Sequence, residues 1–121
     1  MKKNKIMVID DENGSGDLLK HRLEREGYQV LALSDGKGVI SELHSFAPDL
    51  IILDLLMPGY GGLDICEMLN KDPIGLSTPI IVVSGLNKDA DKKKAYSLGV
   101  DEYFVKPVDI GTVAKCHFLS S

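Results

Sequence analysis

The sequence lacks tryptophan, has few aromatic residues (6% of 121) and contains no long apolar run. A membrane-spanning helix needs about 20 consecutive apolar residues, and the apolar runs here have only the length of strands. The basic start, residues 1–5, is followed by one such short run, so a signal peptide is not expected. We therefore expect a cytoplasmic protein that has no membrane partner.

Cysteine is scarce, and positive charge is not in excess. The two cysteines, Cys66 and Cys116, have no metal-ligand spacing, so we expect buried or half-buried thiols in a reducing compartment rather than a disulfide. The formal net charge of −4 argues against direct nucleic acid binding. The one basic cluster, Lys88 with residues 92–94, is interpreted as a solvated helix face; the alternative is a docking surface for an acidic partner.

What the sequence does contain is four short apolar runs, each ending on a residue suited to phosphate or metal chemistry. Residues 6–9 precede Asp10 and Asp11, residues 50–53 precede Asp54, residues 79–83 precede Ser84, and residues 103–105 precede Lys106. Runs rich in Ile and Val are typical of parallel strands buried on both faces. Because ligands bind outside the carboxyl ends of such strands, these side chains are expected at one edge. Crowded carboxylates repel one another unless a cation lies among them, so the pattern predicts a divalent cation beside a phosphoryl site.

Amphipathic segments alternate with these runs at intervals of about twenty residues, which predicts βα repeats in a single domain, residues 1–121. Residues 28–33 form a less uniformly apolar run and are placed at the sheet edge. The expected inward positions of five helices are Leu18, Leu19 and Leu23; Val39, Ile40, Leu43 and Phe46; Leu63, Cys66 and Leu69; Ala95 and Leu98; and Val113, Cys116 and Leu119. The expected helix ends are Gly27, Pro48, Asp72-Pro73 and Gly99, and the expected N-caps are Asn87 or Asp89 for the fourth helix and Asp109 for the fifth.

Five sequence elements, in order and at family-like spacings, resemble the receiver domain of two-component response regulators. They are Asp10-Asp11, Asp54 with Met57-Pro58 and Gly62, Ser84-Gly85, Tyr103, and Lys106-Pro107. The resemblance extends from Ile6 to the last helix. It implies a flavodoxin-like, doubly wound α/β fold, whose five-stranded parallel sheet has the order 2-1-3-4-5 and carries five helices on both faces.

The resemblance also implies the chemistry of the site. Asp54 would accept a phosphoryl group from the phosphohistidine of a histidine kinase or phosphotransfer protein. Lys106 and Ser84 would contact phosphoryl oxygens, and the Lys106-Pro107 peptide bond would be cis. Mg²⁺ is the implied cofactor. Its implied ligands are Asp11, Asp54 and the backbone carbonyl of Leu56, together with Asp10, which would act directly or through a bound water.

A switch is implied as well. Phosphorylation would draw Ser84 inward and let Tyr103 turn after it, which would remodel the surface of the fourth helix, the fifth strand and the fifth helix. That surface would serve a downstream protein, an output domain or a homodimer that forms on phosphorylation. Two leucines, Leu56 and Leu86, border the implied path of hydrolytic water. Since neither offers a polar acceptor, we expect slow loss of the phosphoryl group.

The sequence departs from the family pattern at several glycines. Residues 14–16, Gly-Ser-Gly, stand where the first helix opens; an internal glycine costs about 1 kcal/mol relative to alanine, so a frayed or displaced first turn is expected, with consequences for kinase docking. Gly61 replaces the acid or amide that is common before Gly62, and Gly111 weakens the opening of the last helix.

Other interpretations compete with this one. Asp10 and Asp11 taken alone could cap a helix, and Ser84 could belong to an ordinary turn. A phosphohydrolase or phosphotransferase with an aspartyl nucleophile would carry a second acid two residues later, where this chain has Leu56. A pseudo-receiver would lack an acid, the hydroxyl or the lysine, and all of these are present.

Overall fold

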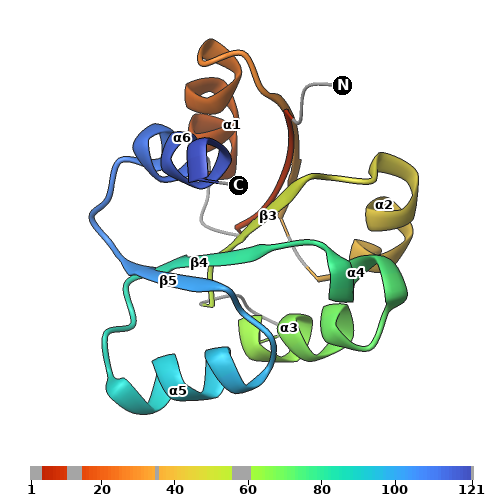
Figure 1. Ribbon diagram of the computed structural model, residues 1–121, viewed down its shortest axis with the longest axis vertical. Helices are drawn as coiled ribbons and strands as arrows, with labels where there is room; N and C mark the ends of the chain where they lie inside the picture. The colour runs from red at the N-terminus through yellow and green to blue at the C-terminus, as the bar shows by residue number, and fades with distance from the viewer. Residues whose placement is uncertain (1–3, 11–14, 35, 56–60, 121) are drawn as a thin grey trace.

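The computed structural model describes residues 4–10, 15–34, 36–55 and 61–120, although not the side chains of 15–17 and 120. At its centre lies a five-stranded parallel sheet with the order β2-β1-β3-β4-β5 (Figure 1). The strands are β1 Lys5–Ile9, β2 Gln29–Leu33, β3 Leu50–Leu53, β4 Ile80–Ser84 and β5 Glu102–Val105. This confirms the predicted fold class, the strand order and the edge position of β2.

Helices cover both faces of the sheet (Figure 1). They are α1 Ser15–Arg25, α2 Val39–Phe46, α3 Gly62–Asn70, α4 Pro73–Ser77, α5 Asp89–Ser97 and α6 Ile110–Ser120. The helices α1 and α6 pack on one face, and α2, α3 and α5 pack on the other. Within the described residues, no helix is long and apolar enough to cross a membrane.

The sheet is buried on both faces because every strand alternates its side chains between two apolar clusters. One cluster contains the strand residues Met7, Ile9, Ile51, Leu53, Ile80 and Val82. The other contains Ile6, Val8, Val30, Leu50, Ile52, Ile81 and Val83. The continuous apolar runs of the sequence therefore divide equally between the two helical layers.

The described structure has six helices rather than the predicted five, because the Asp72-Pro73 pair both follows one helix and begins another. The carboxylate of Asp72 accepts hydrogen bonds from the N–H groups of Ile74 at 3.0 Å and Gly75 at 3.1 Å. Proline is well suited to the first helical position, since it has no N–H to satisfy there. The short helix α4 results, and the predicted fourth and fifth helices are α5 and α6.

The predicted helix ends at Gly27 and Gly99 are confirmed by left-handed φ values of 98° and 95°. The N-cap of α5, however, is Lys88, without a side-chain hydrogen bond, and not Asn87 or Asp89. The helix α1 begins at Ser15, within the glycine-rich segment; Gly14 lies outside the described residues.

Three predicted inward positions are wrong. Leu18 is 72% exposed, Leu119 is 76% exposed, and Cys116 is exposed as well. In α6 the inward stripe instead runs through Ile110, Val113 and Ala114 to Phe118, whose ring stacks on Tyr28 with 5.3 Å between the centroids, while Cys116 and Leu119 lie off this stripe.

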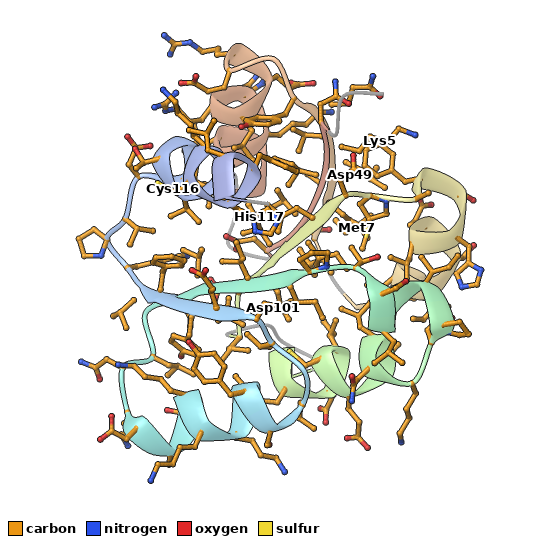
Figure 2. All side chains as sticks on the ribbon, viewed as in Figure 1. Lys5, Met7, Asp49, Asp101, Cys116 and His117 are labelled. Atoms are coloured by element: carbon orange, nitrogen blue, oxygen red, sulfur yellow. The ribbon has the colours of Figure 1, made fainter. Side chains whose placement is uncertain are left out.

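Two carboxylates at the amino ends of strands act as backbone acceptors rather than as members of a site (Figure 2). Asp49 accepts hydrogen bonds from the N–H groups of Asn4 and Lys5, both at 3.0 Å. Asp101 accepts one from the N–H of Ile80 at 2.8 Å. These contacts join the starts of neighbouring strands, whereas the predicted site residues lie at the carboxyl ends of the strands.

The two cysteines should differ sharply in reactivity. Burial raises the pKa of the Cys66 thiol to about 12, so only about one molecule in ten thousand carries the thiolate at pH 8. Iodoacetamide at that pH should therefore modify the native chain once, at the exposed Cys116, and twice after denaturation. A native Cys116→Ser variant should stay unmodified, as judged by intact mass; rapid labelling of that variant would contradict the burial of Cys66.

Candidate functional site

Two carboxylates meet at the carboxyl ends of β1 and β3. These strands are parallel neighbours, and Ile9 is paired with Leu53, so the next residues, Asp10 and Asp54, leave the sheet side by side. The N–H of Asp54 is bonded to the carbonyl of Ile9 at 3.0 Å. Asp10 is only 4% exposed and Asp54 only 2%. Two acids this deeply buried need a positive partner.

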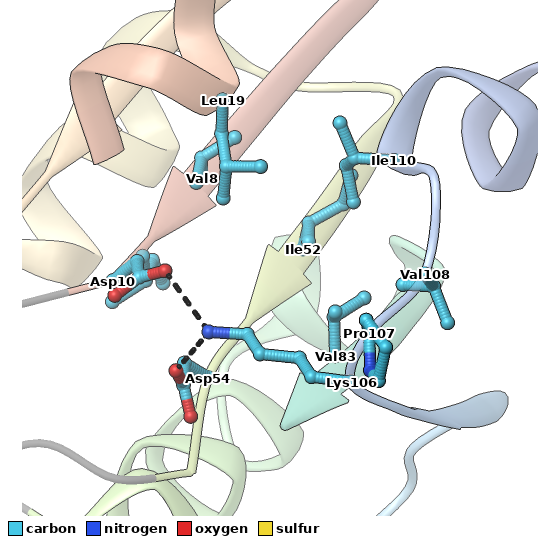
Figure 3. Close-up of a pocket in the computed structure, with 11 residues that line it drawn as sticks. Val8, Asp10, Leu19, Ile52, Asp54, Val83, Lys106, Pro107, Val108 and Ile110 are labelled. Atoms are coloured by element: carbon cyan, nitrogen blue, oxygen red, sulfur yellow. Dashed lines mark hydrogen bonds and ion pairs between the residues drawn. The ribbon is translucent and has the colours of Figure 1, made fainter. Parts of the chain in front are cut away.

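Lys106, the residue directly after β5, supplies that partner (Figure 3). Its Nζ lies 2.9 Å from Oδ2 of Asp54 and 3.7 Å from Oδ2 of Asp10. Its backbone N–H donates to the carbonyl of Ser84 at 2.9 Å, and the Lys106-Pro107 bond is cis, as predicted. Two buried carboxylates and one ammonium thus meet at this edge of the sheet.

A cavity of about 270 Å³ lies beside this ion pair. One end is polar, formed by Asp10, Asp54 and Lys106, and the remaining wall is apolar (Figure 3). The apolar wall includes Val8, Leu19, Ile52, Val83, Val108 and Ile110. The part that α1 and the start of α6 contribute to this cavity is not among the features predicted from the sequence. The signal available was topological, because a sheet of this order packs its first and last helices side by side on one face.

Ser84 and Tyr103 are linked through the loop that follows β4. Ser84 is fully buried, and its Oγ accepts a hydrogen bond from the N–H of Leu86 at 3.3 Å. The hydroxyl of Tyr103 donates to the carbonyl of Leu86 at 2.7 Å. Burial raises the pKa of Tyr103, although its hydrogen bond with the Ser84 side chain acts in the opposite direction. In this structure, Tyr103 is thus already attached to the loop that the predicted switch would move.

Not every predicted site residue can be placed. Asp11, Leu56, Met57 and Pro58 lie outside the described residues. Among the residues that the structure does describe, no group of three or more His, Cys, Asp or Glu side chains is placed to hold a metal ion. Of the predicted metal ligands, the structure therefore brings together Asp10 and Asp54.

Comparison with known proteins agrees with this geometry. The family described as the response regulator receiver domain matches residues 6–116. The alkaline phosphatase synthesis transcriptional regulatory protein PhoP of Bacillus subtilis (strain 168) is 37% identical over 103 residues, which are 85% of this chain and 42% of that protein. The chain thus spans less than half of this relative's length.

Solved structures have the same fold. The signal receiver domain of a signal transduction histidine kinase from Syntrophus aciditrophicus has a TM-score of 0.82 and 30% identity, covering 97% of this chain and 90% of that one. A CheY-like response regulator receiver domain from Methanospirillum hungatei JF-1 has a TM-score of 0.85 and 22% identity, covering 97% and 92%. With the family match over residues 6–116, these findings place the chain in the response regulator receiver domain family of two-component systems.

Proposed function

We propose that this receiver domain accepts a phosphoryl group on Asp54 from a phosphohistidine of a histidine kinase or phosphotransfer protein. The observation that carries the proposal is the pairing of a buried carboxylate, Asp54, with the ammonium of Lys106 at 2.9 Å. The pair lies at the polar end of a cavity. A nucleophile and a charge-neutralising group are the main parts that phosphoryl transfer asks of a protein.

In the proposed step, a carboxylate oxygen of Asp54 forms a bond to phosphorus while the bond between phosphorus and the imidazole nitrogen breaks. The electron pair of the broken bond stays on the partner's imidazole, and Asp54 becomes an acyl phosphate. Lys106, which pairs with Asp54 beforehand, then neutralises a phosphoryl oxygen. The Ser84 hydroxyl, at the carboxyl end of the intervening strand β4, donates a hydrogen bond to another phosphoryl oxygen.

The donor set suits Mg²⁺, which prefers oxygen ligands and one or two carboxylates. Asp10 and Asp54 would hold it, and Asp11 and the backbone carbonyl of Leu56 would complete the protein ligands. When bound, the ion would neutralise charge on the transferring group. The close approach of two buried carboxylates, Asp10 and Asp54, supports a cation site at this place.

The proposed output is a change in the surface of α5, β5 and α6. Tyr103 lies on β5 and bonds the loop that leads into α5, so a shift of Ser84 would reach this surface through Leu86. The partner would be a downstream protein, an output domain or a second copy of the chain. We propose that the domain works in the cytoplasm and does not itself contact nucleic acid.

Intact mass spectrometry tests the proposed function. After incubation with acetyl phosphate and Mg²⁺, the chain should gain the mass of one phosphoryl group, and chelation of Mg²⁺ should prevent this. An Asp54→Asn variant should gain nothing, whereas Asp64→Asn, on the exposed surface of α3, should behave like the parent. An equal gain by the Asp54→Asn variant would refute the assignment.

The lifetime of the phosphoryl group is a separate prediction. A Leu56→Asn, Leu86→Glu double variant should lose its phosphate at least about threefold faster than the parent, because polar groups can orient hydrolytic water. Leu86 also packs against the apolar core, so its substitution requires a check of folding by circular dichroism. Decay of the adduct in the presence of Mg²⁺ gives the rate. A folded double variant that decays no faster would show that these side chains do not set the lifetime.

A further inference from the structure

Arg22 joins α1 to the segment that follows the active-site lysine. Its Nη2 lies 3.3 Å and 3.4 Å from the two carboxylate oxygens of Asp109, and its Nη1 lies 2.6 Å from Oε1 of Glu26. Asp109 comes three residues after Lys106 and directly before α6. The guanidinium therefore connects the first helix to the segment of residues 106–109.

Gly111 leaves room for this guanidinium. A Cβ at position 111 would lie 2.9 Å from Nη2 of Arg22 and 3.0 Å from its Cζ. From the sequence, Gly111 was expected only to weaken the start of the last helix. The structure explains the glycine at this position, because any side chain there must displace the Arg22 guanidinium.

The segment of residues 106–109 is thereby held at both ends. At its start, the N–H of Lys106 is bonded to the carbonyl of Ser84. At its end, Asp109 accepts a hydrogen bond from the N–H of Gly111 at 3.0 Å and pairs with Arg22. The pKa of Asp109 is lowered: burial acts to raise it, but hydrogen bonds from Gly111 and Thr112 and the charge of Arg22 together outweigh that effect.

The same contact joins two of the segments that line the apolar part of the cavity. Leu19, one helical turn before Arg22, lines the cavity from α1, Val108 lines it from the segment of residues 106–109, and Ile110 lines it from the start of α6. An ion pair between these two walls fixes their separation.

We propose that Arg22 is a positioning residue for phosphoryl transfer, which holds the Lys106-bearing segment against α1 while Gly111 provides the space that its guanidinium needs. The proposal rests on the proposed function of Asp54. Arg22 does not touch the reacting atoms. It restrains the backbone segment that carries Lys106, and a more mobile segment would hold the ammonium less well in position to stabilise charge during transfer. The side chains of Arg22 and Asp109 are 38% and 54% exposed, so salt should weaken the pair and the effect should be modest.

The test compares Arg22→Ala, Asp109→Asn and their double variant. Asparagine still caps a helix, so Asp109→Asn removes the charge and keeps the cap. Glu26→Gln is the matched control, because it removes the other carboxylate on Arg22 without touching the segment. The limiting rate constant of adduct formation on Asp54 is measured with Mg²⁺ and increasing acetyl phosphate, at low and high ionic strength.

Each single variant should lower the limiting rate constant about two- to fivefold, as expected for loss of an exposed ion pair. The half-saturating donor concentration should stay the same, and the double variant should be no slower than either single variant. High salt should lower the limiting rate constant of the parent toward the values of the variants, because it screens the ion pair. Gly111→Ala should also slow adduct formation, because its Cβ displaces the Arg22 guanidinium. Alanine favours the helix, so the stability of this variant should not fall. A slower reaction in an equally stable protein would therefore indicate lost positioning rather than a general loss of structure.

Three outcomes would overturn the proposal alone: folded variants that react at the parent rate, additive losses in the double variant, or a loss that salt leaves unchanged. If the parent itself formed no adduct, the proposed function and this inference would fail together.

Discussion

Replacement of Lys106 by methionine is expected to lower the free energy of unfolding by about 2–4 kcal/mol when Mg²⁺ is absent. The variant leaves Asp10 and Asp54, which are 4% and 2% exposed, close together and without the ammonium that pairs with both. Loss of one partner from a fully buried ion pair costs about 3–5 kcal/mol. The lysine side chain itself is 28% exposed, so some solvent screening reduces the cost.

Chemical denaturation in EDTA and in Mg²⁺ measures this effect. Mg²⁺ should recover much of the lost stability in the Lys106→Met variant, because a ligand that binds only the folded state stabilises it. Lys93→Met, at an exposed position of α5, should change the free energy of unfolding by less than about 0.5 kcal/mol. Equal stability of the Lys106→Met variant and the parent in EDTA would contradict the proposed electrostatics of the site.

Replacement of Gly62 by alanine is expected to cost about 3 kcal/mol or more, at the upper end of overpacking effects. A Cβ at Gly62 would lie 2.3 Å from the Cα of Leu55 and 2.8 Å from the carbonyl oxygen of Asp54. These are backbone atoms, so they cannot yield by changing a rotamer. The start of α3 would have to move away from the strand end that carries Asp54, and phosphorylation should fail along with stability.

Gly61→Ala provides an adjacent control. Among the described residues, a Cβ at Gly61 would meet only the side chain of Asp64, 3.2 Å from its Oδ2, and this carboxylate can move. We expect a change of less than about 1 kcal/mol for Gly61→Ala, measured by the same denaturation experiment. If Gly62→Ala were tolerated equally well, the close approach of α3 to the end of β3 would be wrong.

The strands and the charged centre of the site were predictable from the sequence because they rest on local patterns. Uninterrupted Ile- and Val-rich runs identified strands buried on both faces. The residue after each run could then be placed at a common edge, which correctly brought together Asp10, Asp54 and Lys106. The strand order and the cis bond came from the family resemblance rather than from periodicity.

What escaped prediction depends on contacts between segments far apart in the sequence. The Asp72-Pro73 pair correctly predicted the end of one helix, but the start of α4 at the same residues was not predicted, because one pair of residues serves both roles. The inward face of α6 includes Phe118, which stacks on Tyr28, whereas the spacing of apolar residues predicted Cys116 and Leu119 there. The Arg22–Asp109 contact joins residues 87 positions apart, and no local signal marks it.

The central claim is that Asp54 carries the phosphoryl group, and reductive trapping tests it most directly. Borohydride converts an aspartyl phosphate to homoserine, while a free carboxylate does not react. After incubation with acetyl phosphate and Mg²⁺, borohydride treatment and peptide mapping, homoserine should be found at position 54 and should be absent when Mg²⁺ is chelated. Homoserine at Asp10 or Asp11 instead, or no homoserine in a chain that has gained phosphate, would contradict the account.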